Sequence, residues 1–166
     1  PNPGAYDLAL EAVRDLVAKA ETEAGASTDR IGVGMPGSIS PRDGLIRGAN
    51  STWLNGRAFG VDLEAVLGRQ VRLENDANCM ALSEAVDGAA AGAESVFAAI
   101  LGTGTGGGLV IRGRILDGHN GIAGEWGHIP LPWPNDSEYP GHTCWCGRRA
   151  CIETYVSGTG FVRDYQ

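Results

Sequence analysis

Glu125-Trp-Gly-His128 and, after a loop, Cys144-Trp-Cys146-Gly-Arg-Arg-Ala-Cys151-Ile-Glu153 are the motifs that organise the second half of this chain. The three cysteines and the histidine have spacings that suit one tetrahedral Zn2+, and a closed set of this kind is typical of a structural site. A disulfide and three incidental thiols are the alternative interpretations of the cysteines. Two carboxylates flank the cluster, which indicates a scaffold that holds a polar ligand. The zinc ligands we expect are His128, Cys144, Cys146 and Cys151.

The composition excludes several classes of function. The chain has 166 residues, of which 43% are hydrophobic, so we expect one domain or slightly more. A net charge of -7 argues against nucleic acid or an anionic membrane as a partner, because both are bound by clustered Lys and Arg. No apolar run reaches about 18 residues, and the N-terminus does not resemble a signal peptide. Three of the four cysteines lie close together, which favours a reduced compartment, so we expect a cytoplasmic protein.

The pattern of apolar residues and turn residues predicts an α/β chain with a mixed sheet. A helix is expected over residues 5–24, where Gly25 would end it. The expected strands cover residues 31–35, 45–47, 71–73, 96–101, 108–111 and 114–116. Further helices are expected at residues 61–67, at 75–90, from 152 to 156 and at the end of the chain. A long loop at 117–150 precedes the last two, and zinc would hold it in place. Since the chain opens on a helix and stops within a pattern, we expect a fragment of a longer protein.

One carboxylate stands where a strand is expected to pass into a helix, in Leu73-Glu74-Asn75-Asp76-Ala77-Asn78. Asn and Asp are favoured at helix N-termini, so Asp76 has a purely structural interpretation as a cap. Its functional interpretation is that the carboxyl end of a strand in an α/β sheet presents ligand sites, where a carboxylate can take a proton from a hydroxyl.

The glycine-rich stretch Leu101-Gly-Thr-Gly-Thr-Gly-Gly-Gly108 also allows two interpretations. It is either a hairpin with glycines at positive φ, or a loop whose backbone N–H groups surround a phosphate. It is not a Walker A loop, since it has no Gly-Lys-Ser/Thr, and a strand follows where a Rossmann motif needs a helix.

The remaining polar residues have structural interpretations when taken alone. Pro36-Gly37-Ser38 and Asn50-Ser51-Thr52-Trp53 are typical of turns and caps after strands. Cys79 is expected to be a small buried hydrophobic residue, and His119 and His142 are expected to be solvated.

Taken together, the motifs resemble those of the ROK family of bacterial sugar kinases and sugar-responsive repressors. The resemblance extends over residues 5–166, and the residues within the motifs look closest to those of the fructokinase (mannokinase) branch. The motifs that carry it, in chain order, are Gly34-x-Pro36-Gly37, Glu74-Asn75-Asp76-Ala77-Asn78, Gly102-Thr-Gly-Thr-Gly-Gly-Gly108, Glu125-x-Gly127-His128 and Cys144-x-Cys146-Gly147-x-x-x-Cys151-x-Glu153.

The resemblance implies an actin-like, ribonuclease-H-like sugar kinase fold, present in part, in which residues 1–166 are the central portion and 125–153 carry the zinc motif. It implies that Asp76 is the catalytic base. The residues that would contact the sugar are Gly37, Asn50, Asn75, Glu125, His128 and Glu153. The residues that would bind phosphate are Gly102, Thr103, Gly104, Thr105 and Gly106. His128, Cys144, Cys146 and Cys151 match the zinc ligands of the family, and Ala150 stands where the family usually has glycine.

The activity implied is phosphorylation of a hexose by ATP with Mg2+, with fructose to fructose 6-phosphate favoured over mannose, glucose and N-acetyl sugars. The family's N-terminal Asp-x-Gly-Gly-Thr loop and C-terminal half have no counterpart here, so we expect this piece alone to be impaired in ATP binding and turnover. A homodimer is the usual assembly. The alternatives are a sugar-sensing ROK repressor, whose DNA-binding segment would precede residue 1, and a zinc-stabilised sugar-binding domain without activity.

Overall fold

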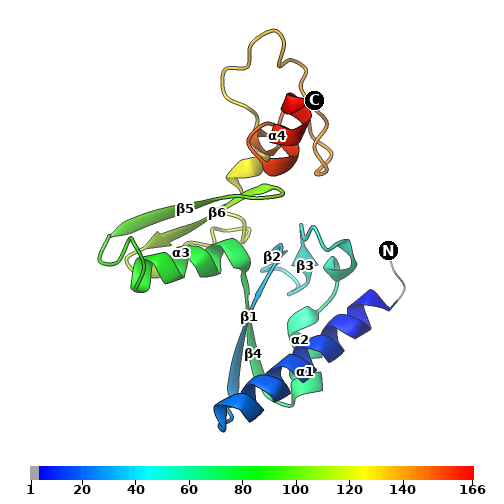
Figure 1. Cartoon of the computed structure of the whole chain (residues 1–166), viewed down its shortest axis with the longest axis vertical. Helices are drawn as coiled ribbons and strands as arrows, with labels where there is room; N and C mark the ends of the chain where they lie inside the picture. The colour runs from blue at the N-terminus through cyan, green and yellow to red at the C-terminus, as the bar shows by residue number, and fades with distance from the viewer. Residues whose placement is uncertain (1–3) are drawn as a thin grey trace. The chain divides into compact units, whose positions relative to one another are not determined.

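The computed structural model describes residues 4–166 and divides into two compact units, one ending at Asp76 and the other running from Ala77 to Gln166. Figure 1 shows the first unit from blue to green and the second from green to red. Each unit has its own core of buried residues.

The first unit is built around two parallel strands. The strands β1 (Arg30–Met35) and β4 (Gln70–Asn75) pair from Arg30 opposite Gln70 to Met35 opposite Asn75. A parallel pair needs a crossover, and here the connection includes the short hairpin β2 (Ser38–Ile39) with β3 (Ile46–Arg47), the turn η1 (Thr52–Leu54) and the helix α2 (Phe59–Leu67). The long helix α1 (Ala5–Ala24) precedes β1 (Figure 1).

Packing in the first unit follows the apolar periodicity of the sequence. The side chain of Tyr6 in α1 makes edge contacts with Trp53 and Phe59, at ring-centroid distances of 6.4 and 5.9 Å. Gly25 ends α1 in the left-handed conformation, with its N–H bonded to the carbonyl of Glu21, as the sequence predicts. The buried residues of this core are Tyr6, Leu10, Met35, Ile46, Ala49, Leu54, Phe59 and Leu63.

The second unit pairs a helix with an antiparallel sheet. The helix α3 (Asp76–Val86) follows β4 directly, and the strands β5 (Ser95–Leu101), β6 (Thr105–Ile111) and β7 (Arg114–Ile115) pair in that order. Gly108 lets α3 approach the sheet, because a Cβ there would lie 2.6 Å from the Ala77 carbonyl and 2.7 Å from the Ala81 methyl. The chain ends with the turns η2 (Trp126–His128) and η3 (Ile152–Thr154) and the helix α4 (Gly158–Tyr165).

Four predictions about the elements need correction. Within the described residues the strands form separate parallel and antiparallel sheets, not one mixed sheet, because each unit pairs only its own strands. The helix expected at 75–90 ends at Val86, where Ser83 accepts bonds from the next turn. The helix expected from 152 is the short turn η3, whereas the further helix expected at the end of the chain is present as α4. β6 starts within the glycine run, and none of those glycines has positive φ.

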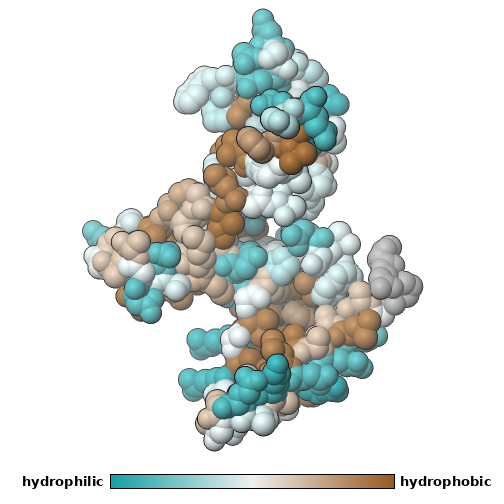
Figure 2. All heavy atoms as spheres, viewed as in Figure 1, coloured by the Kyte–Doolittle hydropathy of each residue, from teal (hydrophilic) through white to brown (hydrophobic). Residues whose placement is uncertain are grey.

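The surface carries hydrophobic residues as well as charges. Figure 2 shows hydrophobic residues over α4, where Phe161 and Val162 are 71% and 55% exposed. Among residues 4–166 no helix has both the length and the apolarity needed to cross a bilayer. Cys79 is half-buried and not fully enclosed, whereas His119 and His142 are exposed as expected.

Candidate functional site

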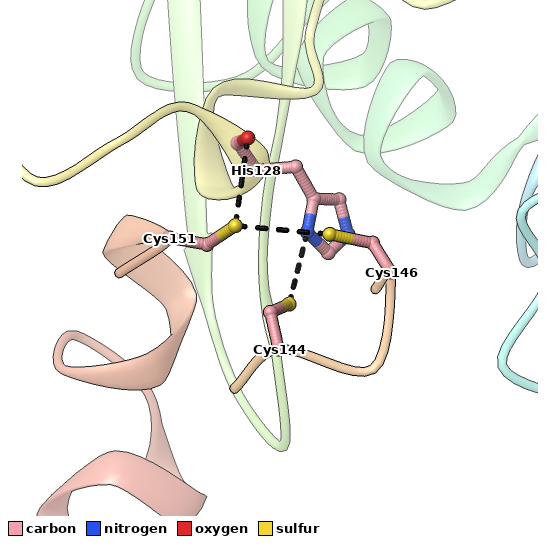
Figure 3. Close-up of side chains that lie close together, drawn as sticks. All are labelled: His128, Cys144, Cys146 and Cys151. Atoms are coloured by element: carbon pink, nitrogen blue, oxygen red, sulfur yellow. Dashed lines mark hydrogen bonds between the residues drawn. The ribbon is translucent and has the colours of Figure 1, made fainter. Parts of the chain in front are cut away.

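The four predicted metal ligands converge in the second unit. Their ligand atoms all lie within 4.8 Å of one another, and Figure 3 shows the three thiols and the imidazole pointing toward a common centre. The Cys144 Sγ lies 3.5 Å from Nδ1 of His128, and the Cys146 Sγ lies 3.7 Å from that of Cys151. No disulfide links them, because all four cysteines of the chain are free.

Three separate segments bring these ligands together. His128 ends the turn η2, and a bridge between Pro130 and Cys151 holds the start of η3 beside it. The first two cysteines lie on a tight turn in which the Cys144 N–H donates to the Arg148 carbonyl at 2.8 Å. Gly147 lies in this turn at φ 86°, a conformation that favours glycine.

The chemistry of this donor set fits Zn2+. Burial raises the pKa of the Cys144 thiol, and burial together with hydrogen bonds to neighbouring thiols raises that of Cys151 to about 12. Burial acts the same way on Cys146, but hydrogen bonds from the backbone and side chain of Arg148 outweigh it and lower that pKa. Buried thiols of this kind become thiolates when a cation replaces their protons, and three thiolates with one imidazole form a closed tetrahedral set.

Glu153 lies at the centre of the contacts beside this cluster. Its side chain is 8% exposed, and its two oxygens accept different hydrogen bonds. The backbone N–H of Thr105 donates to Oε2 at 2.8 Å, and the indole Nε1 of Trp145 donates to Oε1 at 2.6 Å. Gly104 must be glycine here, because a Cβ would lie 2.4 Å from the same Oε2. The carboxylate therefore links the metal cluster to the glycine-rich hairpin.

The glycine-rich hairpin is fastened along the segment that follows Glu153. Gly158 donates its N–H to the carbonyl of Gly102 at 2.7 Å, and Thr159 Oγ1 donates to that of Thr103 at 3.1 Å. The hydroxyl of Thr105 donates to the Val156 carbonyl. Because Glu153 already accepts the Thr105 N–H, that amide is engaged within the protein.

Polar residues of the first unit meet where β1 and β4 end. Asn75, the last residue of β4, donates from Nδ2 to the Gly37 carbonyl at 2.9 Å. Gly37 has φ 82°, and a Cβ there would lie 2.5 Å from the Arg47 carbonyl oxygen and 2.7 Å from the Ala49 nitrogen. Three predicted motifs, around residues 37, 50 and 75, therefore converge at the carboxyl ends of the parallel strands.

The structure places the other predicted residues as follows. Asp76 is exposed and is the first residue of α3, immediately beyond the Asn75 contact. Asn50 is exposed, next to the buried Ala49. Glu125 and His128 flank η2 at its two ends, where the His128 N–H bonds to the Glu125 carbonyl at 3.3 Å.

Two polar residues beside these sites were not predicted. Asn55 binds the Ala49 backbone twice, donating from Nδ2 and accepting at Oδ1, each at 2.9 Å. Trp145 lies between two cysteines of the His/Cys cluster and binds Glu153. An Asn after the turn Ser51–Leu54 and an aromatic residue inside Cys-x-Cys were the available signals, but neither pattern specifies its distant partner.

The sequence of this chain is similar to those of known proteins. The ROK family profile matches residues 1–166. An N-acetyl-D-glucosamine kinase of Photobacterium profundum is 43% identical over 164 residues, which cover 96% of this chain and 54% of that protein. The chain thus spans about half the length of the curated relatives it matches.

Two crystal structures of ROK proteins are similar in fold. A ROK family glucokinase from Streptomyces griseus, in complex with glucose and AMPPNP, has a TM-score of 0.77 and 32% identity, covering 93% of this chain and 47% of that one. A ROK family transcriptional regulator, a homologue of the E. coli MLC protein, has a TM-score of 0.74 and 25% identity, covering 96% and 38%.

The names of these relatives test the expected similarity to the fructokinase branch. They carry the name N-acetyl-D-glucosamine kinase, so the expected closeness to fructokinases is not supported. The fold is the α/β fold of the ROK sugar kinases in part, and the His/Cys cluster is typical of the ROK zinc site. Because the ROK family model matches residues 1–166, the chain belongs to the ROK family.

Proposed function

We propose that this chain is part of an ATP-dependent hexose kinase in which Asp76 is the general base. The observation that carries the proposal is the position of Asp76, at the start of α3 and directly after the Asn75–Gly37 hydrogen bond. A carboxylate fixed at the carboxyl end of a parallel strand is well placed to orient a hydroxyl and take its proton as the phosphoryl group arrives.

The other predicted residues would bind the sugar. Gly37, Asn50 and Asn75 supply polar groups around the end of β4, and Glu125, His128 and Glu153 supply acceptors and a ring nitrogen in the second unit. His128 can both bind the metal and contact the sugar, because its Nδ1 faces Cys144 and its Nε2 is then left for a hydroxyl.

Phosphate binding is assigned to residues 102–106, with a refinement from the structure. The Thr105 amide donates to Glu153 and the Gly102 amide to the Gly104 carbonyl, so the amides at the tip, those of Thr103 and Gly104, are the donors we assign to phosphate. Mg2+ bound with ATP would neutralise charge on the transferred phosphoryl group.

Zinc has a structural role in this proposal. His128, Cys144, Cys146 and Cys151 would hold it, and no ligand position would remain for substrate. Its effect on the sugar would be indirect, because the metal fixes His128 and the turn that carries Trp145, which in turn binds Glu153.

The sugar we put first is N-acetyl-D-glucosamine, because relatives 43% identical to this chain carry that substrate in their name. Fructose, which the residues within the sequence motifs favour, is the alternative substrate, with glucose and mannose next. One assay with all four sugars separates them.

A sugar-sensing repressor is the second candidate function, since a ROK transcriptional regulator shares the fold at 25% identity. A repressor needs sugar binding and DNA binding but no base, so it would tolerate loss of Asp76. Sugar-dependent DNA binding by the full-length protein, without phosphorylation, would favour this candidate.

The test of the kinase proposal is Asp76→Asn in the full-length protein. The amide keeps the size of the side chain but cannot take a proton, so we predict that turnover falls at least about 100-fold while sugar binding survives. Asp87→Asn, an exposed position beyond the other end of α3, is the control for the same charge change. A near-normal rate for Asp76→Asn would refute the assignment.

A further inference from the structure

We propose that Trp145 is a positioning residue of the sugar site, which holds the Glu153 carboxylate by its indole N–H and the His128 ring by an edge contact. This inference rests on the proposed function, since it concerns how two of its sugar-binding residues are oriented.

The geometry places Trp145 against both of these residues. Its Nε1 donates to Glu153 Oε1 at 2.6 Å, and its ring meets that of His128 edge-on, at 4.9 Å between centroids and 83° between planes. The two flanking residues, Cys144 and Cys146, belong to the metal cluster, so the backbone on both sides of the indole is fixed by that cluster.

The hydrogen bonds of Glu153 leave it able to bind a ligand. An ionised carboxylate offers about four acceptor positions. Trp145 and, at 3.8 Å, the Cys144 thiol donate to Oε1, whereas Thr105 alone donates to Oε2. Oε2 thus keeps capacity for a sugar hydroxyl. These donors also fix the side-chain torsions of Glu153, which lowers the entropy that sugar binding would otherwise lose in ordering it.

Trp145 reaches from the interior of the second unit to solvent. The residue is 60% exposed although its N–H is bonded to a carboxylate that is 8% exposed, so the indole spans from the interior to solvent.

The test compares Trp145→Phe with the wild type in the full-length, zinc-loaded protein. Phe keeps an aromatic ring beside His128 but lacks the N–H. Since a hydrogen bond to a charged group contributes about 1.5–3 kcal/mol, we expect the KM or Kd for N-acetyl-D-glucosamine to rise about tenfold or more. The KM for ATP and the zinc content are expected to stay unchanged.

Two further variants sharpen the comparison. Trp133→Phe is the matched control, because Trp133 lies in the same connection at 96% exposure, and we expect its KM to stay within about twofold of the wild type. In a Glu153→Gln background, Trp145→Phe is expected to add little, since the charged acceptor is already gone.

The outcomes separate this inference from the kinase proposal. If the wild type phosphorylates a sugar but Trp145→Phe leaves its KM unchanged, the inference is overturned and the kinase remains. If Trp145→Phe lowers zinc content and both KM values change together, Trp145 is structural and the inference is overturned. If the wild type binds sugar without phosphorylating it, the kinase proposal fails and the Kd values still decide on Trp145. If the wild type binds none of the sugars, the kinase proposal and the inference about Trp145 are both refuted.

Discussion

Gly37→Ala is the substitution for which the structure gives the clearest magnitude. Gly37 has φ 82°, and a Cβ there would lie 2.5 Å from the Arg47 carbonyl oxygen and 2.7 Å from the Ala49 nitrogen, both backbone atoms of the same unit. The left-handed conformation costs a non-glycine residue about 1–2 kcal/mol, and overpacking adds about 1–3 kcal/mol, so we expect a loss of about 2–5 kcal/mol in the stability of the first unit.

The same substitution should also disturb the site. The Gly37 carbonyl accepts the Asn75 side chain at 2.9 Å, so a shift of this backbone would move the amide beside Asp76. We therefore expect kcat/KM for the sugar to fall along with stability.

Hydrogen exchange of the β1 and β4 amides at increasing urea concentrations measures the free energy of unfolding of the first unit alone. The control is Gly44→Ala, since Gly44 has φ 72° but nothing within 4 Å of an added Cβ, and should lose only about 1–2 kcal/mol from the conformation. Equal losses for the two variants would refute the close contact at Gly37.

Three further predictions concern the metal cluster and the first unit. Zinc affinity should rise at least about tenfold per pH unit between pH 6 and 8, because burial raises the pKa of the Cys151 thiol to about 12 and binding must displace its proton. Competition with a chromophoric chelator measures this affinity. An affinity that does not change with pH would argue against thiolate ligands. Ala150→Gly should leave stability unchanged or raise it by up to about 1 kcal/mol, since Ala150 has φ 55°. Thermal unfolding of the zinc-loaded protein measures the change. A clear loss of stability would contradict the strained backbone at this position. The hydrogen bond from Arg69 lowers the pKa of Glu21, so the stability this pair contributes should be complete above about pH 5 and lost as the pH falls through the lowered pKa. Urea unfolding of the wild type and Glu21→Gln should therefore differ at pH 7, and the difference should shrink as the pH is lowered through the acid range.

Local signals in the sequence predicted local structure well. The helix over residues 5–24 has the predicted bounds, because its apolar stripe and its glycine cap are both determined by neighbouring residues. The metal cluster was also predictable, since cysteine and histidine at short spacing have few other uses.

Partners that are distant in sequence were less predictable. The pairing of β1 with β4, and the use of Gly108 to admit α3 against β6, depend on residues 27 or more positions apart. One of the two interpretations of the glycine run was a hairpin with glycines at positive φ, yet Gly104 and Gly108 are required by close neighbours, Glu153 and Ala77. Composition cannot distinguish these two reasons for a glycine.

The contact between Trp145 and Glu153 shows the same limit within a predicted site. Both residues lie in the cysteine motif, but the direction of each side chain depends on the turn that the cluster imposes. The residue types were visible in the sequence, and their mutual orientation was not.

Direct detection of sugar phosphate tests the central claim most directly. The full-length protein would be incubated with ATP and Mg2+ and, in turn, N-acetyl-D-glucosamine, fructose, glucose and mannose, with products identified by phosphorus NMR and zinc measured on the same sample. We predict a 6-phosphate of one sugar, first of all N-acetyl-D-glucosamine, with about one zinc per chain, as the four-ligand cluster implies. Zinc-loaded protein that forms no phosphate ester with any of the four would contradict the account.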